Sequence, residues 1–446
     1  MLVVISVIFL GLIFIFIGIF LKTSKSEKRY DQAIELFEEE KYKEALELFQ
    51  ELLAKESTNK LYNWYIGQCY ENLQNYELAI VEYNKVALST KFPPPLNEAE
   101  IHEKLAMMNL KIGNINKAFQ EFQIVTTLSP SNAEAFYYLG VLTKNNDDLQ
   151  KSLEYFDRAI NASDSFPEAY LEHGKLHFHL KHIDKAKRSF VNAIEQNPDM
   201  PEAHYYYGMI LEKDRIYQKS IREFRLALED KRFRFDSYVH LGNVYWALSQ
   251  KEEAFDNFEK ALEIGKGKGE DLVEAKYQYA DHLVQSGDLN KAIKLWNEIN
   301  NASPKYKDVE NRLHVYSEIS KSENLTKFIT SLKNDFLTAG SAICKLLKLR
   351  VEKYKFKKED YLEFVGNQRV SGMEMPCVLH LTRWTTLVGE IPLRELLDRM
   401  AEEGATKGIF VTSARFLEKA QDLSKIRPLT LIDREELEKL LARVYS

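Results

Sequence analysis

The chain has 446 residues, of which 45% are hydrophobic, and a formal net charge of −6. Its cysteines, Cys69, Cys344 and Cys377, are few, odd in number and without a CxxC pair. This argues against a disulfide framework and indicates a reducing compartment. Residues 321–446 hold 22 basic and 18 acidic side chains, whereas the remainder holds 39 and 49. The asymmetry is consistent with different partners for the two parts, and equally with ordinary surface composition.

An uncharged apolar segment opens the sequence. Leu2 to Leu21 consists almost wholly of Val, Ile, Leu, Phe and Gly, and about twenty such residues span a bilayer as a helix. A cleaved signal peptide is the alternative, but no charged region precedes the segment and no A-x-A pattern follows it. We therefore expect an uncleaved transmembrane anchor at residues 1–22.

Basic side chains follow this segment and none precedes it; they are Lys22, Lys25, Lys28 and Arg29. Cytoplasmic flanks of membrane helices carry an excess of Lys and Arg. We therefore expect a single-pass protein of the inner (cytoplasmic) membrane, with its N-terminus outside and the bulk of the chain in the cytoplasm.

Glycines recur at a fixed interval in the middle of the chain. Gly140, Gly174, Gly208 and Gly242 are spaced 34 residues apart. Twelve positions after each lies a small residue and four further on a Phe; these are Ser152, Ala186, Ser220 and Ala254, then Phe156, Phe190, Phe224 and Phe258. Antiparallel helices approach closely only where Gly, Ala or Ser lies, and large residues fill the space to the next unit. The interval predicts stacked helix–turn–helix units.

This pattern resembles the tetratricopeptide repeat (TPR), whose period is 34 residues. Weaker copies extend in both directions, so we expect an all-α TPR solenoid of eight repeats over residues 26–305. A capping helix and linker are expected over residues 306–324, with the helix at Val309–Ile319. His173 and His177 in one repeat have zinc-ligand spacing, but they occupy interior positions of the repeat, which favours core packing.

The concave face of such a solenoid is the expected binding site. Positions of each repeat's first helix that usually line it hold a mixture of side chains; they are Tyr137, Val141, Lys144, Lys175, Phe178, Tyr205, Met209, Asn243 and Trp246. The mixture suits an extended peptide or a helix and lacks the regular Lys and Asn set of chaperone-binding members. We expect a protein or peptide partner here, with packing between repeats as the alternative role of several of these residues.

The 34-residue rhythm stops near residue 306, and residues 325–446 alternate between strand and helix patterns. The order α-β-β-β-α-β-α-β-α predicts a mixed sheet with helices on its faces. The expected elements are a helix at Leu325–Leu347, strands at Arg350–Phe356, Tyr361–Val365 and Cys377–Arg383, a helix at Pro392–Glu403, a strand at Gly408–Val411, a helix at Arg415–Leu423, a strand at Leu429–Ile432 and a helix at Glu435–Val444.

The second half of this region carries short motifs: Gly389 with Arg394-Glu395-Leu396, residues 404–408, Val411-Thr412-Ser413 with Phe416 and Ala420, and Leu431-Ile432-Asp433 with Glu435-Glu436-Leu437. With them the segment resembles the Mrr-type restriction endonuclease-like domain of the PD-(D/E)xK nuclease superfamily. The resemblance implies an α/β fold and Mg²⁺-dependent cleavage of DNA. It also implies a catalytic Asp on one strand and a Glu/Gln-x-Lys motif on the next.

The residues at the expected catalytic positions depart from that pattern. His380 falls where Glu or Gln belongs, Thr382 falls where Lys belongs, and counting back places Asn367 near the Asp position. Neutral Thr and Asn do not replace a cationic Lys and a metal-binding carboxylate. We therefore expect a non-cleaving domain without a cofactor. The alternative is a Mg²⁺-dependent nuclease with an unorthodox site around Glu363, Glu374, His380 and Arg383.

A run of cations precedes the expected strands; its members include Lys348, Arg350, Lys353, Lys355, Lys357 and Lys358. Such a stripe is able to contact DNA phosphates, whereas a solvated strand face is the simpler interpretation. Taken together, the sequence predicts a membrane-tethered cytoplasmic scaffold that binds protein partners through its TPR groove. Membrane-associated DNA binding, with or without cleavage, is the alternative.

Overall fold

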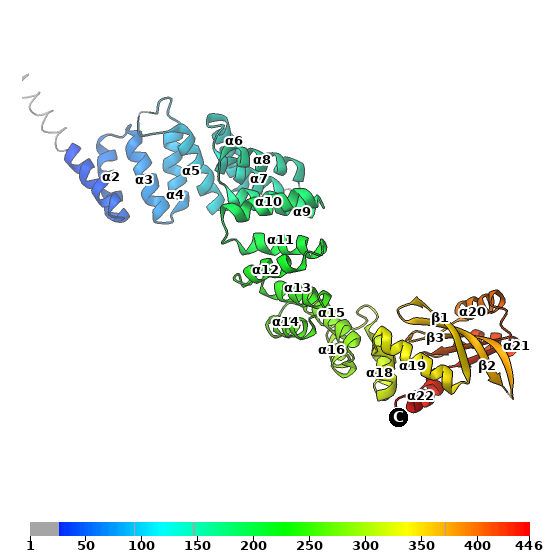
Figure 1. The fold of residues 1–446 in the computed structure, drawn as a ribbon. Helices are drawn as coiled ribbons and strands as arrows, with labels where there is room; N and C mark the ends of the chain where they lie inside the picture. Colours follow the sequence, from blue (N-terminus) through cyan, green and yellow to red (C-terminus); the bar gives the residue numbers. More distant parts are fainter. Residues whose placement is uncertain (1–25, 93, 146–147, 371) are drawn as a thin grey trace, which may run out of the picture. The chain divides into compact units, whose positions relative to one another are not determined.

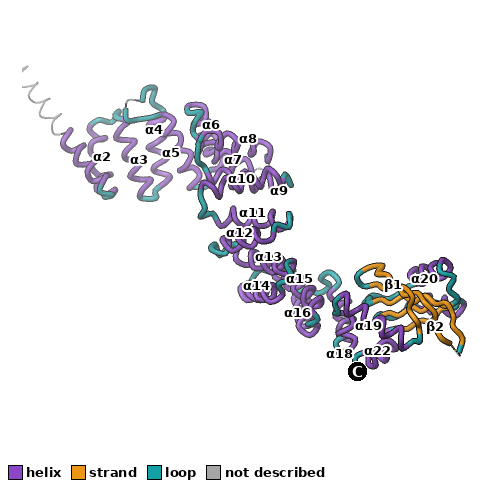
Figure 2. The backbone as a smooth tube through the Cα atoms, viewed as in Figure 1, coloured by secondary structure: helices purple, strands orange, loops and turns teal. Residues whose placement is uncertain are grey.

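The computed structural model describes residues 26–92, 94–145, 148–370 and 372–446. The predicted anchor at residues 1–22 lies outside this range, and no helix within the range is long and apolar enough to cross a membrane. The chain divides into two compact units, one up to Asp230 and the other from Lys231. Among the described residues, strands occur only in the second unit, after α19 (Figure 2).

Helices are the only regular elements among the described residues of the first unit, and most connections are short; a longer loop joins α4 to α5 (Figure 1). Some helix starts follow from single residues: Pro167 and Pro201 occupy first helical positions, where the missing N–H costs nothing. A helix over residues 26–38 is followed by α2 (Tyr42–Lys55), α3 (Lys60–Asn72), α4 (Tyr76–Ala87), α5 (Glu98–Lys111), α6 (Ile115–Leu128), α7 (Ala133–Asn145), α8 (Leu149–Ala162), α9 (Pro167–His179), α10 (Ile183–Gln196), α11 (Pro201–Lys213) and α12 (Tyr217–Ala227).

The crossing points of these helix pairs explain the 34-residue interval. A Cβ atom added to Gly174 would lie 2.7 Å from the ring of Phe190, so the first helix approaches the second only because position 174 has no side chain. Gly140 has the same relation to Phe156. At that crossing the hydroxyl of Ser152 donates a 2.7 Å hydrogen bond to the Gly140 carbonyl. The recurring residues thus mark recurring close contacts.

The second unit begins with further helices and continues into the α/β domain. Its helical part comprises α13 (Arg234–Ala247), α14 (Lys251–Ile264), α15 (Glu270–Ser286), α16 (Leu289–Ala302), α17 (Val309–Ile319), α18 (Glu323–Thr330) and α19 (Lys333–Leu346). The single helix expected at Leu325–Leu347 is therefore wrong, because it is divided into α18 and α19. Ser331 between them is extended, and its carbonyl accepts a hydrogen bond from Arg383 instead of a helical N–H.

Five strands form one mixed sheet in the order β1-β2-β3-β4-β5. The antiparallel part contains β1 (Leu349–Lys358), β2 (Tyr361–Val370) and β3 (Met373–Thr382); β4 (Lys407–Thr412) and β5 (Leu429–Ile432) continue it in parallel. A Cβ atom at Gly366 would lie 1.9 Å from the Arg350 carbonyl oxygen. Glycine therefore permits the close approach of β1, which has a register irregularity at this point.

Helices cover both faces of the sheet (Figure 1). On one face, α19 and α22 (Arg434–Val444) bury a core that includes Phe336, Phe364 and Leu437. On the other, α20 (Glu390–Glu402) and α21 (Glu418–Ile426) bury a core that includes Leu396 and Phe410. Because side chains alternate along a strand, the second face also receives the side chains of the candidate site.

Candidate functional site

Glu363 and His380 lie side by side on the sheet face that α20 covers. The register of β2 and β3 pairs these two residues directly, and both side chains are buried, at 2% and 0% exposure. His380 contacts the Glu363 carboxylate at 3.2 Å through Nε2, and its Nδ1 lies 2.5 Å from the Tyr361 hydroxyl. The result is a buried polar cluster in the part of the sheet where the Mrr resemblance places catalysis.

Two cations complete this cluster. Arg399 of α20 donates from Nε to Glu363 Oε1 at 2.8 Å, and Lys357 Nζ of β1 lies 3.6 Å from Oε2. Burial acts to raise the pKa of Glu363, but the hydrogen bonds from His380 and Arg399 outweigh it and lower the pKa to about 2. Burial lowers the pKa of His380, so at neutral pH the ring is neutral beside an ionised carboxylate.

Thr382 is fully buried on the same face of β3. Its hydroxyl donates to Thr412 Oγ1 at 3.0 Å, and Thr412 Oγ1 in turn accepts the backbone N–H of Ala414 at 3.1 Å. The position where the resemblance expects a lysine therefore holds a neutral hydroxyl that links two strands. It carries no charge toward Glu363.

The other residues considered for a catalytic site lie elsewhere. Asn367 pairs with Pro376, and its amide donates to Glu352. Glu374 pairs with Arg369 near the turn that joins β2 and β3. Arg383 projects to the opposite face, where its guanidinium lies over the Phe336 ring at 4.9 Å.

The basic stripe follows β1, an edge strand of the sheet. All six cations considered for nucleic-acid contact are exposed: Lys348, Arg350, Lys353, Lys355, Lys357 and Lys358. Two of them are engaged, because Lys353 pairs with Glu403 at 2.6 Å and Lys357 approaches Glu363. Lys and Arg on an edge strand also oppose unwanted strand pairing, so the stripe has a structural role that needs no ligand.

The candidate groove residues are all half-buried, which leaves surface both for packing and for a ligand. In the first unit, Lys144 and Lys175 hold Glu172 from both sides, at 2.5 and 2.7 Å, and Lys175 also contacts Glu202 at 2.6 Å. These lysines are therefore balanced by acidic residues of the same surface. The remaining positions here are aromatic or aliphatic: Tyr137, Val141, Phe178, Tyr205 and Met209.

In the second unit, the two candidate groove residues form part of a polar and aromatic cluster. Asn243 donates to Gln278 at 2.9 Å and contacts His282 Nε2 at 3.1 Å. Trp246 stacks on the His282 ring with centroids 4.6 Å apart. Burial lowers the pKa of His282 to about 4, so this cluster is uncharged near neutral pH.

Two histidines of α9, His173 and His177, form a chain of contacts with His182, which directly precedes α10. His177 Nε2 lies 3.1 Å from His173 Nε2, and His177 Nδ1 lies 3.3 Å from His182 Nδ1. His173 continues the chain to the Ser189 hydroxyl at 2.8 Å. His177 is buried, and burial followed by the nearby His173 lowers its pKa to about 4. The His177 ring is therefore neutral at neutral pH.

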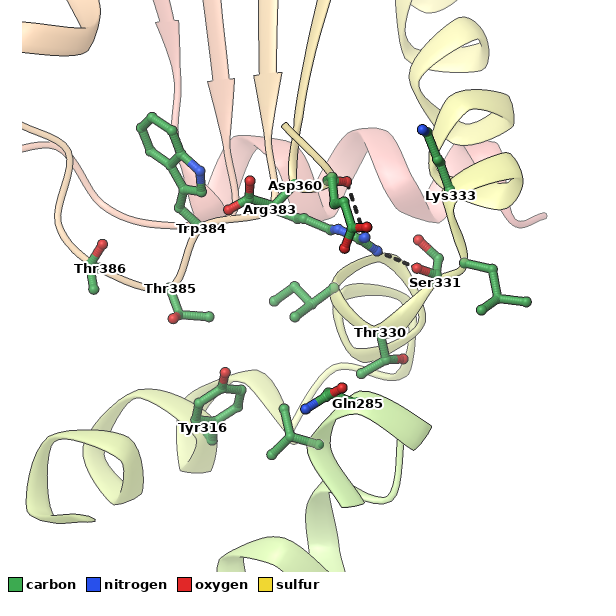
Figure 3. Close-up of a pocket in the computed structure, with 14 residues that line it drawn as sticks. Gln285, Tyr316, Thr330, Ser331, Lys333, Asp360, Arg383, Trp384, Thr385 and Thr386 are labelled. Atoms are coloured by element: carbon green, nitrogen blue, oxygen red, sulfur yellow. Dashed lines mark hydrogen bonds between the residues drawn. The ribbon is translucent and has the colours of Figure 1, made fainter. Parts of the chain in front are cut away.

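A cavity of about 600 Å³ lies beyond the carboxyl end of β3, beside α15, α17 and α18 (Figure 3). Tyr316 and Trp384 contribute aromatic walls, and Arg383 reaches the Ser331 carbonyl. A second cavity of about 530 Å³ shares Thr385 and Thr386 with the first and is also lined by Arg415 and Arg434. Sequence patterns did not indicate either cavity, because each is assembled from segments far apart in the chain.

Models of known protein families match both the helical repeats and the α/β domain. Models described as tetratricopeptide repeat match residues 30–94, 171–237 and 235–264. A restriction endonuclease model of the Mrr type matches residues 340–441. No curated protein matches the chain.

Solved structures with similarity to this chain include several repeat proteins. The C-terminal part of a TPR protein from Cytophaga hutchinsonii has 19% identity and a TM-score of 0.39, covering 64% of this chain and 99% of its own. YrrB, described as a TPR protein with an unusual peptide-binding site, has 20% identity and a TM-score of 0.35, with coverages of 38% and 87%. PilF of Pseudomonas aeruginosa has 16% identity and a TM-score of 0.39, with coverages of 48% and 95%. The family matches show that the chain carries tetratricopeptide repeats followed by a C-terminal restriction endonuclease-like domain.

Proposed function

We propose that this protein is a membrane-tethered cytoplasmic scaffold whose repeats bind a protein segment and whose nuclease-like domain does not cleave DNA. The TPR matches support a role in protein interaction, and the mixed, half-buried surface around Lys144, Lys175 and Tyr205 suits an extended peptide or a helix. The uncharged segment at Leu2–Leu21 supports the tether.

One observation carries the non-cleaving assignment: both oxygens of Glu363 are already held by the protein. Arg399 occupies Oε1, and His380 with Lys357 surrounds Oε2. A Mg²⁺ ion requires oxygen ligands and near-octahedral geometry, whereas the nearest partners of this carboxylate are cationic or neutral nitrogen groups. The residues present therefore do not fit the metal that the fold family implies, and Thr382 does not supply the charge of the family's lysine.

A cleavage assay with the full chain tests this proposal. Supercoiled and linear DNA would be incubated with Mg²⁺ or Mn²⁺, and the wild type would be compared with Glu363→Gln. We expect no products above the background of the variant. Metal-dependent cleavage that disappears in Glu363→Gln would establish the nuclease alternative instead.

The tether and the groove need separate measurements. Full-length protein should remain with membranes after alkaline extraction and move to the soluble fraction when residues 1–22 are deleted. For the groove, a partner retained by the wild type should be lost from Lys175→Glu, which reverses charge beside Glu172 and Glu202. Retention by Lys175→Glu would place the partner on another surface.

DNA binding without cleavage is the second candidate, because the exposed cations of β1 are gathered on one edge strand. Each phosphate contact by Lys or Arg makes affinity fall with salt. A DNA titration of the full chain at low and physiological salt would show a steep salt dependence that Lys355→Gln and Lys358→Gln reduce. Binding that is absent at both salt concentrations would exclude this candidate.

A further inference from the structure

The 530 Å³ cavity lies in the second unit, beyond the ends of strands β3, β4 and β5. Thr386 and Arg415 line it from the loops that follow β3 and β4, and Arg434 lines it from the first position of α22, which follows β5. These three strands are the parallel strands of the sheet. Ligands of open α/β sheets bind outside the carboxyl ends of such strands, so the cavity occupies the usual position of a ligand site for this kind of sheet.

Helix α17, the expected capping helix, lines one side of this cavity. His314 and Val315 of α17 line it opposite Arg415 and Arg434. Its volume falls within the range of roughly 300–1,000 Å³ that small-molecule sites occupy. A bound molecule would therefore contact both α17 and the α/β domain, whereas a nucleic-acid duplex exceeds the size of the cavity.

The two arginines give the cavity a surplus of positive charge. Arg434 is oriented by a 2.9 Å hydrogen bond from its Nε to the Ser413 carbonyl, and within the described part of the chain it forms no ion pair. Arg415 has one long contact of 3.5 Å with Glu435, and both of these side chains are exposed. Glu318, which also lines the cavity, pairs with Lys321 at 2.6 Å and in addition attracts Arg415 and Arg434 electrostatically, so it offsets one of the positive charges.

The lowered pKa of Arg434 is consistent with this surplus of positive charge. Burial and the charge of nearby Arg415 lower the pKa of Arg434 below its usual range. An anion between the two guanidinium groups would relieve their repulsion and accept hydrogen bonds from both. Phosphate suits this arrangement because arginine presents a planar set of donors that matches its oxygens.

We infer that this cavity binds a phosphorylated small molecule of about mononucleotide size, with the phosphate held by Arg415 and Arg434. Thr386 lines the same cavity, and Val315 and Leu387 provide apolar surface for the rest of the ligand. Binding would link α17 to the α/β domain. This site is separate from the Glu363 cluster and does not depend on whether that cluster is catalytic.

Calorimetric titration of the purified full chain tests the inference. AMP is the probe, adenosine tests the need for the phosphate, and inorganic phosphate serves as a competitor. We expect AMP to bind, adenosine not to bind and phosphate to displace AMP. Arg415→Gln should weaken AMP binding about tenfold or more, because a hydrogen bond to a charged group is lost. Arg415 is exposed, so this variant should fold normally.

Matched variants separate specific from general effects. Arg434→Gln should also weaken binding, whereas Arg394→Gln, which removes an exposed arginine of α20, should leave it unchanged. Equal binding of AMP and adenosine, or AMP affinity unchanged in Arg415→Gln, would overturn the inference. It would also be overturned if AMP failed to bind at millimolar concentration, or if a DNA duplex bound through Arg415 and AMP did not compete.

Discussion

A cluster around His177 in the repeats and a cluster around Glu363 in the α/β domain both bury polar side chains, but with opposite charge states. In the repeats, His177 is neutral and exchanges contacts with two other imidazole rings. In the α/β domain, Glu363 remains ionised because Arg399 and Lys357 lie beside it. Burying a polar group requires a hydrogen bond, and burying a charge requires a partner of opposite sign. The comparison indicates that the His177 cluster depends on neutral contacts, whereas the Glu363 cluster depends on charge balance.

The largest expected loss of stability comes from a substitution at a point where two repeat helices cross. Phe190→Ala should lower the free energy of unfolding by about 3–5 kcal/mol, because a fully buried ring is replaced by a cavity. Chemical denaturation of the full chain measures this loss. Gly174→Ala should destabilise the wild type by about 1–3 kcal/mol, because its new Cβ meets the Phe190 ring.

The double variant sharpens that prediction. With the ring of Phe190 removed, the extra methyl of Gly174→Ala has room, so its cost should largely disappear in the Phe190→Ala background. Additive effects of the two substitutions would contradict the direct contact between positions 174 and 190.

A smaller loss of stability is expected when Arg399 is removed from the Glu363 cluster. Arg399→Met should lower the free energy of unfolding by up to about 3 kcal/mol, because Glu363 loses the partner of its Oε1 atom. Lys357 and His380 remain and limit the loss. Glu363→Gln in the Arg399→Met background should restore much of the stability, as measured by thermal unfolding. A double variant less stable than Arg399→Met would show that charge balance is not the cause.

The contribution of His177 to stability should change with pH between about 4 and 6.5. The pKa of His177 is about 4 in the folded protein, below its ordinary value of 6.5. Between these values the unfolded state binds more protons, so stability falls as the pH drops from about 6.5 to 4. His177→Leu should flatten the pH dependence of the unfolding midpoint in this window, and an unchanged slope would contradict the neutral buried ring.

The carboxylate should respond at lower pH. The pKa of Glu363 is about 2 in the folded protein, against an ordinary value of 4.5. Its stabilising contribution is present above about pH 4.5 and is lost as the pH falls toward 2. The wild type should therefore approach the stability of Glu363→Gln on acidification within this range. A difference that stays constant from pH 5 to 2.5 would contradict the paired, ionised state.

The sequence predicted those features that repeat or that depend on local periodicity. The spacing of Gly174 and Phe190 reflects a contact that recurs in other repeats, and the order of strands and helices after α19 follows from short periodic segments. The break at Ser331 was missed because its cause is a hydrogen bond from Arg383, more than fifty residues away. A helical pattern alone does not contain that information.

The candidate site shows the same limit. The pairing of Val370 with Met373 sets the register of β2 and β3, which brings Glu363 opposite His380 and Asn367 opposite Pro376. The contact of Arg399 with Glu363 joins a helix to a strand 36 positions earlier. The sequence named Glu363 and His380 together as parts of an alternative site, but no local pattern encodes their direct contact or the approach of Arg399.

Metal binding at Glu363 tests the central claim most directly. Mn²⁺ would be titrated into the full-length wild type and into Glu363→Gln, with free Mn²⁺ followed by electron paramagnetic resonance. Because Arg399, His380 and Lys357 surround the carboxylate, we predict the same binding curve for both proteins. A site of one Mn²⁺ per chain that is present in the wild type and lost in Glu363→Gln would contradict the non-cleaving scaffold.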